Sequence, residues 1–249
     1  MAAEARTTPN YWQKETGNFQ PFRVAGNPFD AILRKHLPVD PRLSCVEVGA
    51  YPGANLLYLA RTFGYQPFAI EYRDDADDIG RLFEFNGFKK PEIFQEDFLR
   101  FDRRRFDVVA SFGFVEHFND PQAVIRKQLD LVNPGGHLVL SVPHFWGMQG
   151  LFRKLTFSRE ALAELFATHN MGIMHLSAIK AALHEPGLET LFLGHTMNGT
   201  FWVPADSPKV REDRLWLARA LNYFDRSIGS KLPSCFLISP MILAICKFR

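Results

Sequence analysis

Cysteine is scarce in this sequence. The chain has 249 residues and three cysteines, none of which form a Cys-x-x-Cys pair. Zinc ribbons, thiol redox motifs and disulfide frameworks need paired or evenly numbered cysteines, so the sequence argues against each of these classes and predicts no metal site. Cys45 lies in an apolar run, where a buried free thiol is the expected state. This usage is typical of a reducing compartment, and we expect a cytoplasmic protein.

Long apolar runs are also missing. The most apolar segment, residues 235–246, is about half as long as a membrane span and is interrupted by Pro240. The first twenty residues contain no apolar stretch of the length found in signal peptides. The sequence therefore predicts no transmembrane segment and no leader, and we expect the 235–246 segment to contain a core strand.

Neither sign of charge is in clear excess. Lysine and arginine total 29, and aspartate and glutamate total 27, which leaves a formal net charge of +2. Nucleic-acid-binding domains usually have a strongly basic surface, so we expect no nucleic-acid partner. Hydrophobic residues make up 47% of the chain and include 24 phenylalanines, which is enough to fill the core of one α/β domain and to line part of a pocket.

Strand-like and helix-like runs alternate between Leu43 and Phe145. This order is typical of βαβ units and predicts a parallel sheet. The expected strands cover residues 43–48, 67–72, 92–95, 106–112, 137–142, 189–193 and 241–248. The expected helices cover residues 54–63, a segment ending near 86, and residues 121–132, 158–168, 177–184 and 211–228. The expected N-caps are Asp120, Ser158 and Ser177. We also expect a turn over 133–136 and a long loop over 195–210.

A glycine turn after the first strand is the strongest local signal. In residues 46–53 a strand, a turn and a helix N-terminus present backbone N–H groups to a ligand. Gly49 allows a ligand to approach the backbone, and Gly53 lets the helix begin close to the strand. The middle glycine of the dinucleotide pattern Gly-x-Gly-x-x-Gly is absent, which disfavours a nicotinamide-dependent oxidoreductase. Glu71, at the end of the second strand, can accept hydrogen bonds from both hydroxyls of a ribose.

Five segments in the right order resemble the motifs of class I S-adenosylmethionine-dependent methyltransferases. Residues 47–53 are similar to motif I, and residues 70–71 are similar to motif II. Residues 96–98 resemble the segment after the third strand, 106–118 resemble motif IV with its following loop, and 131–143 resemble the turn and fifth strand that come next. The family often has aspartate at the first position of motif I, where this sequence has glutamate.

The resemblance implies a Rossmann-like α/β fold. Its sheet would have seven strands, mostly parallel, with helices on both faces and an antiparallel last strand. We divide the single domain into an N-terminal arm or cap over 1–40, a cofactor-binding core over 41–145 and an acceptor-side part over 146–249. The helix over 211–228 would pack against its own sheet, with a membrane surface or a partner as the alternative. A homodimer is left open.

S-adenosylmethionine is therefore the expected cofactor, and S-adenosylhomocysteine is the expected product. By the resemblance, Glu47 would orient the glycine turn and meet the methionine amino group through a water. The other residues divide by the part of the cofactor that they would contact: Gly49, Ala50 and Gly53 the methionine portion, Glu71 the ribose, Tyr72 the face of the adenine, Asp97 and the Phe98 N–H the adenine edge, and Phe112 and Gly113 the sulfonium.

Three histidines are candidates for a general base. Methyl transfer from a sulfonium is an in-line displacement, so alignment and desolvation of the acceptor supply most of the rate, and a base helps when the acceptor is a hydroxyl. His117 is the first candidate because it follows the fourth strand at the carboxyl edge of the sheet, where ligands bind. His144 is the second and His169 the third. Each could instead be a pocket wall or a structural residue, and Glu116 could pair with His117 or cap a helix.

The acceptor is predicted from shorter strings. Tyr11-Trp12, residues 111–118 and His169-Asn170 are similar to bacterial methyltransferases of surface-polysaccharide and natural-product pathways, which implies O-methylation of a small molecule or a glycan. N-methylation of a small molecule and a noncatalytic S-adenosylmethionine-binding module remain as alternatives. Tyr11 and Trp12 would form either a flap over the cofactor or an ordinary surface anchor.

Overall fold

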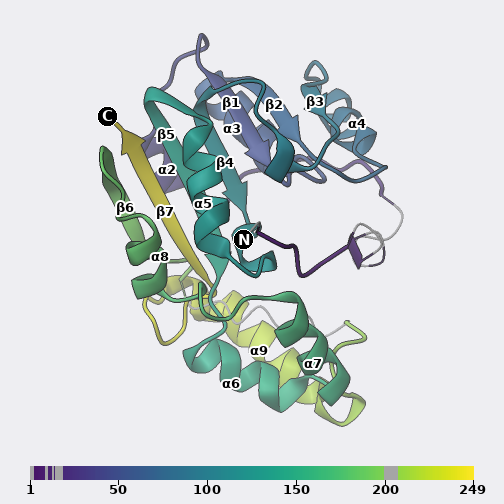
Figure 1. The fold of residues 1–249 in the computed structure, drawn as a ribbon. Helices are drawn as coiled ribbons and strands as arrows, with labels where there is room; N and C mark the ends of the chain where they lie inside the picture. Colours follow the sequence, from purple (N-terminus) through teal and green to yellow (C-terminus); the bar gives the residue numbers. More distant parts are fainter. Residues whose placement is uncertain (1–2, 9–10, 13, 15–18, 199–206) are drawn as a thin grey trace.

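The computed structural model describes residues 3–8, 11–12, 14, 19–198 and 207–249. Its centre is a seven-stranded sheet with the order β3-β2-β1-β4-β5-β7-β6 (Figure 1). The strands are β1 (Ser44–Val48), β2 (Gln66–Ile70), β3 (Glu92–Phe94), β4 (Phe106–Phe112), β5 (Val132–Pro143), β6 (Leu188–Thr196) and β7 (Met241–Phe248). β7 runs antiparallel to both of its neighbours, and the other adjacent pairs are parallel. The expected fold class is confirmed.

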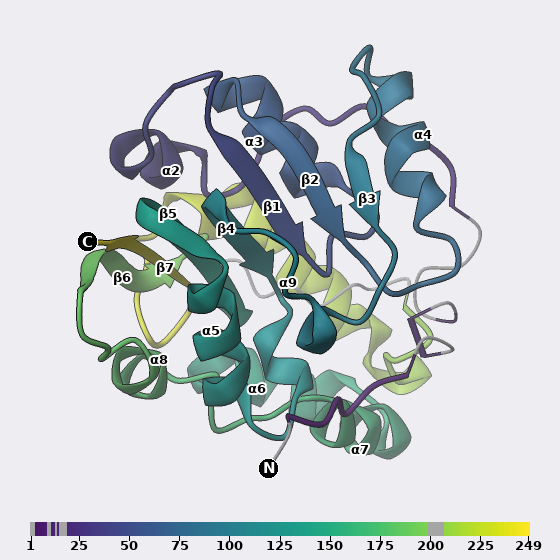
Figure 2. The same cartoon turned by 45° about the horizontal axis from the view of Figure 1, so that its top comes forward.

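Helices cover both faces of the sheet (Figure 2). One face carries α2 (Asp30–His36), α3 (Ala54–Phe63) and α4 (Asp77–Phe85), and the other carries α5 (Pro121–Asp130) and α8 (Leu176–Ala182). Successive strand residues point to opposite faces, so Cys45 packs with the first group of helices and Val46 with the second. Because both faces are covered, all five residues of β1 are buried.

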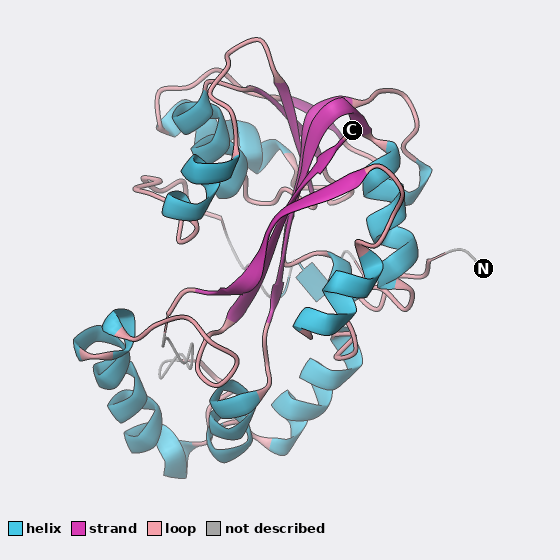
Figure 3. Cartoon of the chain, turned by 90° about the vertical axis from the view of Figure 1, so that its left-hand side faces the viewer, coloured by secondary structure: helices cyan, strands magenta, loops and turns pink. Residues whose placement is uncertain are grey.

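A third group of helices lies beyond the carboxyl ends of the parallel strands. It comprises α6 (Gly147–Thr156), α7 (Arg159–Thr168) and α9 (Leu215–Ser227), and Figure 3 shows it below the sheet. These helices bury a cluster of their own, whose members are Phe157, Ala161, Val210, Ala218 and Leu221. We call this group the three-helix unit. The expected packing of helix 211–228 against the sheet is wrong, because the apolar face of α9 meets α6 and α7 instead.

Two strands are longer than the sequence predicts. β5 includes residues 133–136, and a register shift opposite β4 accommodates them instead of a separate turn. β6 continues to Thr196, which takes His195 out of the expected loop over 195–210 and pairs it with β7. Residues 199–206 of that loop lie outside the described part of the chain.

Two helices, α2 and α6, have no clear signal in the sequence. α2 buries Leu33 as its one fully covered apolar side chain, and the buried face of α6 consists of the polar residues Gln149, Arg153 and Thr156. Neither face forms the apolar stripe by which a helix is recognised. No helix among the described residues is both long and apolar enough to cross a membrane.

The predicted helix caps have mixed outcomes. Asp120 Oδ1 accepts from the Ala123 N–H at 3.0 Å, and Ser158 Oγ accepts from the Ala161 N–H at 3.1 Å, so both of these caps are confirmed. α8 begins at Leu176, two residues before the start that a cap at Ser177 would allow, and has no side-chain cap, so the capping role expected for Ser177 is wrong.

Candidate cofactor and acceptor site

A pocket of about 430 Å³ opens at the carboxyl ends of β1, β2, β3 and β4. Four parallel strands end together here, so residues that are far apart in the sequence meet at one edge of the sheet. Of the residues that the sequence predicts for the cofactor or the base, those in the wall are Gly49, Glu71, Tyr72, Asp97, Phe98, Phe112, Gly113 and His117. The volume suits a ligand of nucleoside size.

Five predicted residues are not in this wall: Glu47, Ala50, Gly53, His144 and His169. Ala50 is buried, and Gly53 begins α3 with a φ of 98°, where an added Cβ would lie 2.8 Å from Ile79 Cγ2. Both residues support the turn without forming part of the pocket wall. Their direct contact with the methionine portion stays a prediction.

Gly49 is required by its surroundings. Its φ of 67° is in the left-handed region, and an added Cβ would overlap the ring of Phe114, which follows β4. The Gly49 N–H donates to the Ile70 carbonyl at 3.0 Å, which holds the turn against β2. The pocket floor is therefore a close approach between two loops that only a residue without a side chain permits.

Glu47 is buried in β1, two residues before this turn, with 2% of its surface exposed. Asn55 Nδ2 donates to Glu47 Oε1 at 3.3 Å, and Oε2 has no partner among the described residues. Burial raises the pKa of Glu47 to about 8. A buried oxygen without a donor is an unfilled hydrogen bond, which fits the role predicted for Glu47 toward the methionine amino group through a water.

Glu71 follows β2 and is held by the backbone. The Tyr51 N–H donates to Oε2 at 3.1 Å, and the Tyr72 and Arg73 N–H groups donate to Oε1 at 2.9 and 3.2 Å. Burial raises the pKa of Glu71, and the three N–H donors act in the opposite direction. A carboxylate has about four acceptor positions, so room is left for a ribose hydroxyl without any rearrangement.

Arg73 is a pocket residue that the sequence reasoning missed. Its side chain is almost fully buried, and Nε and Nη2 donate to Asp75 at 2.7 and 2.6 Å. The guanidinium carbon lies 3.7 Å from the centre of the Tyr51 ring, and Tyr51 Oη donates to Asp78 at 3.1 Å. The acidic turn after β2 therefore clamps the glycine turn after β1. The signal that could have shown this is the single arginine beside a run of aspartates.

Asp97 and Phe98 follow β3 at the opposite side of the pocket. Asp97 Oδ1 accepts from the Leu99 N–H at 2.9 Å and caps the short helix η1 (Phe98–Arg100). The Asp97 side chain is half exposed, and its second oxygen is 3.9 Å from Arg100 Nε. Asp97 therefore keeps hydrogen-bonding capacity for an adenine amino group.

His117 lines the pocket on the helical turn η2 (Val115–His117), which follows β4. Its Nδ1 lies 2.8 Å from the Thr168 carbonyl oxygen, so Nδ1–H is the donor and Nε2 carries a lone pair. Burial lowers the pKa of His117 to about 4. Near neutral pH the imidazole is therefore uncharged, which is the form that accepts a proton.

The other two candidate bases lie outside the pocket wall. The His169 ring centre is 4.5 Å from that of His117, and burial lowers the pKa of His169 to about 3. His144 is fully buried after β5, where its Nδ1 lies 2.9 Å from the Ser239 carbonyl oxygen and its ring is 4.6 Å from His195. These positions favour structural roles, and the base roles of both residues stay predictions.

Glu116 is a buried acid whose isolation the sequence did not indicate. Its side chain is fully buried, and neither carboxyl oxygen has a hydrogen-bond partner among the described residues. Oε1 lies 3.8 Å from His117 Nε2 and 3.4 Å from the place where a Cβ on Gly113 would be. Burial raises the pKa of Glu116 to about 8. An acid and a base therefore face each other at the edge of the pocket.

The N-terminal segment crosses the mouth of the pocket. Trp12 is part of the wall, with its ring edge-on to His117 at 4.7 Å between centres. The Arg6 N–H donates to the His117 carbonyl at 2.7 Å, and Ala5 forms a β-bridge with Phe118. For Trp12 this arrangement favours the flap over the surface anchor.

Comparison with known proteins places the chain in a family. Residues 21–192 match a family model described as a methyltransferase domain. The tRNA U34 carboxymethyltransferase of Campylobacter curvus (strain 525.92) is 29% identical over 136 residues, which are 51% of this chain. The matched part is 44% of that relative, so the chain spans less than half of its length.

Solved structures share the fold at low sequence identity. The geranyl diphosphate C-methyltransferase from Streptomyces coelicolor A3(2) is 14% identical, with a TM-score of 0.60 over 88% of this chain and 78% of that chain. Coclaurine N-methyltransferase is 12% identical, with a TM-score of 0.58 over 87% and 70%. The [4+2]-cyclase SpnF is 14% identical, with a TM-score of 0.57 over 88% and 78%. The first two were solved with S-adenosylhomocysteine bound.

The family match covers more than half of the chain and spans every strand end that forms the pocket. The glycine turn, the acid after β2 and the segment after β4 lie within it, as the motifs predict. The chain belongs to the class I, S-adenosylmethionine-dependent family of methyltransferase domains.

Proposed function

We propose that this protein transfers a methyl group from S-adenosylmethionine to a hydroxyl of a small molecule or glycan, with His117 as the general base. The observation that carries the proposal is the uncharged imidazole in the pocket wall, with Nδ1–H bonded to the Thr168 carbonyl and Nε2 next to buried Glu116. A hydroxyl is a weak nucleophile that must lose its proton on methylation, so a hydroxyl acceptor benefits from a base of this kind.

The pocket has what the cofactor needs. S-adenosylmethionine supplies a methyl group made reactive by its positive sulfur. The glycine cradle fits the methionine end, with the unfilled Glu47 oxygen behind the wall, and the spare capacity of Glu71 fits the ribose. Asp97 and Phe98 would meet the adenine, and Phe112 and Gly113 would border the reacting centre.

Each residue around the acceptor has a separate task. The Thr168 carbonyl fixes the tautomer and orientation of His117, so Nε2 is ready to take the hydroxyl proton. Glu116, when ionised, offsets the positive charge that this proton places on the imidazole. Trp12 and the N-terminal segment cover the pocket mouth and keep bulk water from the acceptor.

Replacing the base tests the proposal. His117→Ala should lower kcat by about 100-fold or more with S-adenosylmethionine affinity nearly unchanged, because the imidazole acts on the acceptor proton. The measurement is S-adenosylhomocysteine release with hydroxyl acceptors, together with calorimetric titration of the cofactor. His169→Ala is the matched control, since that ring lies one layer behind, and it should retain most of the turnover. A loss of only a few-fold in His117→Ala would reduce His117 to a wall residue.

A second candidate is N-methylation of a small amine, and the isolation of Glu116 favours it. A cationic ammonium group would provide the donors that both carboxyl oxygens lack. The two functions separate in Glu116→Gln: KM for an amine acceptor should rise at least tenfold, whereas KM for a hydroxyl acceptor should change little. Cofactor binding without turnover of any hydroxyl or amine would instead support the noncatalytic module.

A further inference from the structure

Arg153 is a buried arginine without an acidic partner in the described part of the chain. It projects from α6, and 4% of its surface is exposed. Its Nη1 donates to the Gln149 carbonyl and to Gln149 Oε1, both at 3.0 Å, and its guanidinium carbon lies 4.2 Å from the centre of the Phe145 ring. Neither contact neutralises the charge. A buried cation without a counter-charge destabilises a fold, so the question is what this group serves.

The surroundings of Arg153 are basic. Its charge contributes to lowering the pKa of both His144 and His169, and Lys209 acts on His169 in the same direction. Burial lowers the pKa of Arg153 to about 10, so the guanidinium remains charged at neutral pH. Gln149, which holds the guanidinium, is itself fixed because its Nε2 donates to the Ile238 carbonyl at 2.7 Å. The charge is therefore held rigidly, and the histidines near it are uncharged at neutral pH and do not compensate it.

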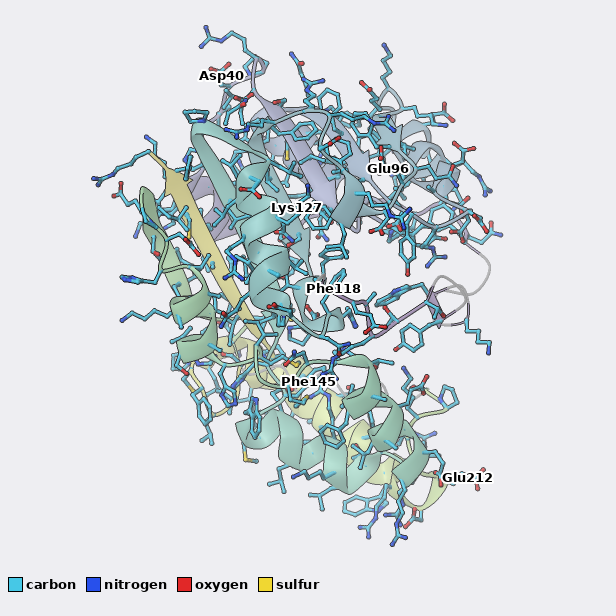
Figure 4. All side chains as sticks on the ribbon, viewed as in Figure 1. Asp40, Glu96, Phe118, Lys127, Phe145 and Glu212 are labelled. Carbon is cyan, nitrogen blue, oxygen red and sulfur yellow. The ribbon has the colours of Figure 1, made fainter. Side chains whose placement is uncertain are left out.

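This position is connected to the cofactor pocket by a row of rings. His117 lines the pocket, and His169 is 4.5 Å from it between ring centres. Phe145 is 5.5 Å from His169, and Arg153 stacks on Phe145. Figure 4 shows Phe145 where the sheet meets the three-helix unit, below Phe118. Arg153 itself lies outside the wall of that pocket, so an acceptor would have to extend from the His117 end past His169 and Phe145 to meet it.

We propose that Arg153 is the anion-binding residue of the acceptor site, and that the acceptor carries a carboxylate or a phosphate at the end remote from the methylated atom. The Nε and Nη2 donors of Arg153 have no partner among the described residues, and two such donors match two oxygens of either group. The statement about the acceptor rests on the proposed function. The anion site itself does not.

Binding of simple anions tests the site without any methyl transfer. Wild-type protein is titrated with inorganic phosphate and, separately, with acetate, at constant ionic strength adjusted with sodium chloride. We expect the unfolding midpoint to rise by about 3–6 °C at ten times Kd. Phosphate and acetate should also raise the NMR-observed pKa of His169, because a bound anion neutralises the nearby guanidinium. The stronger of the two effects identifies which anion the site prefers.

Substitution of Arg153 distinguishes a role in anion binding from a purely structural role. Arg153→Gln should weaken phosphate or acetate binding at least tenfold, and Arg153→Lys, which keeps the charge but loses the fork, should give an intermediate value. Arg104→Gln is the matched control, because Arg104 also stacks on a phenylalanine, at 4.1 Å from the Phe68 ring, but is exposed. If wild type and Arg153→Gln bind both anions equally weakly while Arg153→Gln stays folded, the guanidinium is only a scaffold and the proposal fails.

Matched pairs of acceptors test the second part of the proposal, that the acceptor carries a carboxylate or a phosphate. Hydroxybenzoate is compared with its methyl ester, and a hexose phosphate with the free hexose, by S-adenosylhomocysteine release. The charged member of an accepted pair should have at least a tenfold higher kcat/KM, and Arg153→Gln should remove the difference by raising KM. Equal turnover of both members would overturn the acceptor assignment. Anion binding with His117→Ala fully active would leave the site standing and remove the proposed base, so the two failures are distinguishable.

Discussion

The two sides of the pocket treat their polar groups differently. On the cofactor side the carboxylates of Glu71 and Asp97 already accept backbone N–H groups, and Arg73 is paired with Asp75. In the region that we propose for the acceptor, outside the pocket wall itself, Glu116 is buried without a hydrogen-bond partner and Arg153 without an acidic one, within the described chain. In the first region the polar side chains already have partners within the protein. In the second region the missing partners would come from a ligand.

The difference has a physical reason. A cofactor that is shared by a whole family can be met by backbone donors and strand ends, which the fold itself positions. In our proposal the acceptor is met by side chains on later segments of the chain, and a buried polar group there costs stability until a ligand supplies its partner. Glu47 is the exception on the cofactor side, since one of its oxygens lacks a partner. Glu47 is not in the pocket wall, so its role toward a ligand stays a prediction.

The largest expected effect is on the preformed cofactor side. Gly49→Ala should lower the free energy of unfolding by about 2–4 kcal/mol, because the added Cβ overlaps the Phe114 ring and the backbone is left-handed. Gly87→Ala is the control: φ there is 81° but nothing lies within 4 Å of an added Cβ, so about 1 kcal/mol is expected. Denaturant unfolding measures both. Equal losses would mean that the close approach of the two loops is not what demands Gly49.

Next in size is the loss of the ribose contact. Glu71→Ala should weaken S-adenosylmethionine binding by about 1–3 kcal/mol, because it also strands the backbone N–H groups that now bind the carboxylate. Asp97→Ala should have a smaller effect, since that side chain is half exposed and water can replace it. Calorimetric titration compares the two. Unchanged affinity in Glu71→Ala would refute the ribose assignment.

The smallest expected effect is a gain in stability on the acceptor side. Burial raises the pKa of Glu116 to about 8, above its ordinary value in an unfolded chain. Between those two values the unfolded state releases the proton and the folded state keeps it, so stability falls as pH rises through this range. Glu116→Gln removes that loss and should stabilise the protein by about 1 kcal/mol at pH 8, and by little at pH 4.5. Thermal unfolding at several pH values measures it, and a pH-independent difference would contradict the assignment.

The pKa of His117 is shifted in the opposite direction to that of Glu116, so its effect on stability has the opposite pH dependence. Burial lowers its pKa to about 4, so stability that depends on the uncharged imidazole is complete above its ordinary value and is lost as pH falls toward 4. The acid limb of the pH profile of kcat should therefore lie at a pH well below that at which an exposed histidine titrates. A limb near pH 6.5 would mean that His117 is not the titrating base, or that the bound acceptor restores its ordinary pKa.

Local residue order predicts which residues meet at this edge of the sheet. The Glu47–Gly53 turn and Glu71 end or directly follow a strand, and Asp97 comes three residues after β3, so the order of strands alone places them at one edge. Arg73 escapes this reasoning because its role depends on which aspartate and which ring it meets across two loops. The acceptor side was predicted less well, since α6 presents a polar buried face and α9 packs on α6 and α7 rather than on the sheet.

The sequence by itself determined the sheet, the glycine turn and the carboxylates at the strand ends. Hydrophobic periodicity, turn residues and the order of strands can be recognised without knowing how the elements pack. Tertiary structure alone decided that Glu116 and Arg153 are buried, that His117 is uncharged, and that His144 lies away from the pocket. Burial and charge are set by neighbours from distant parts of the chain, and those neighbours are chosen only when the helices pack.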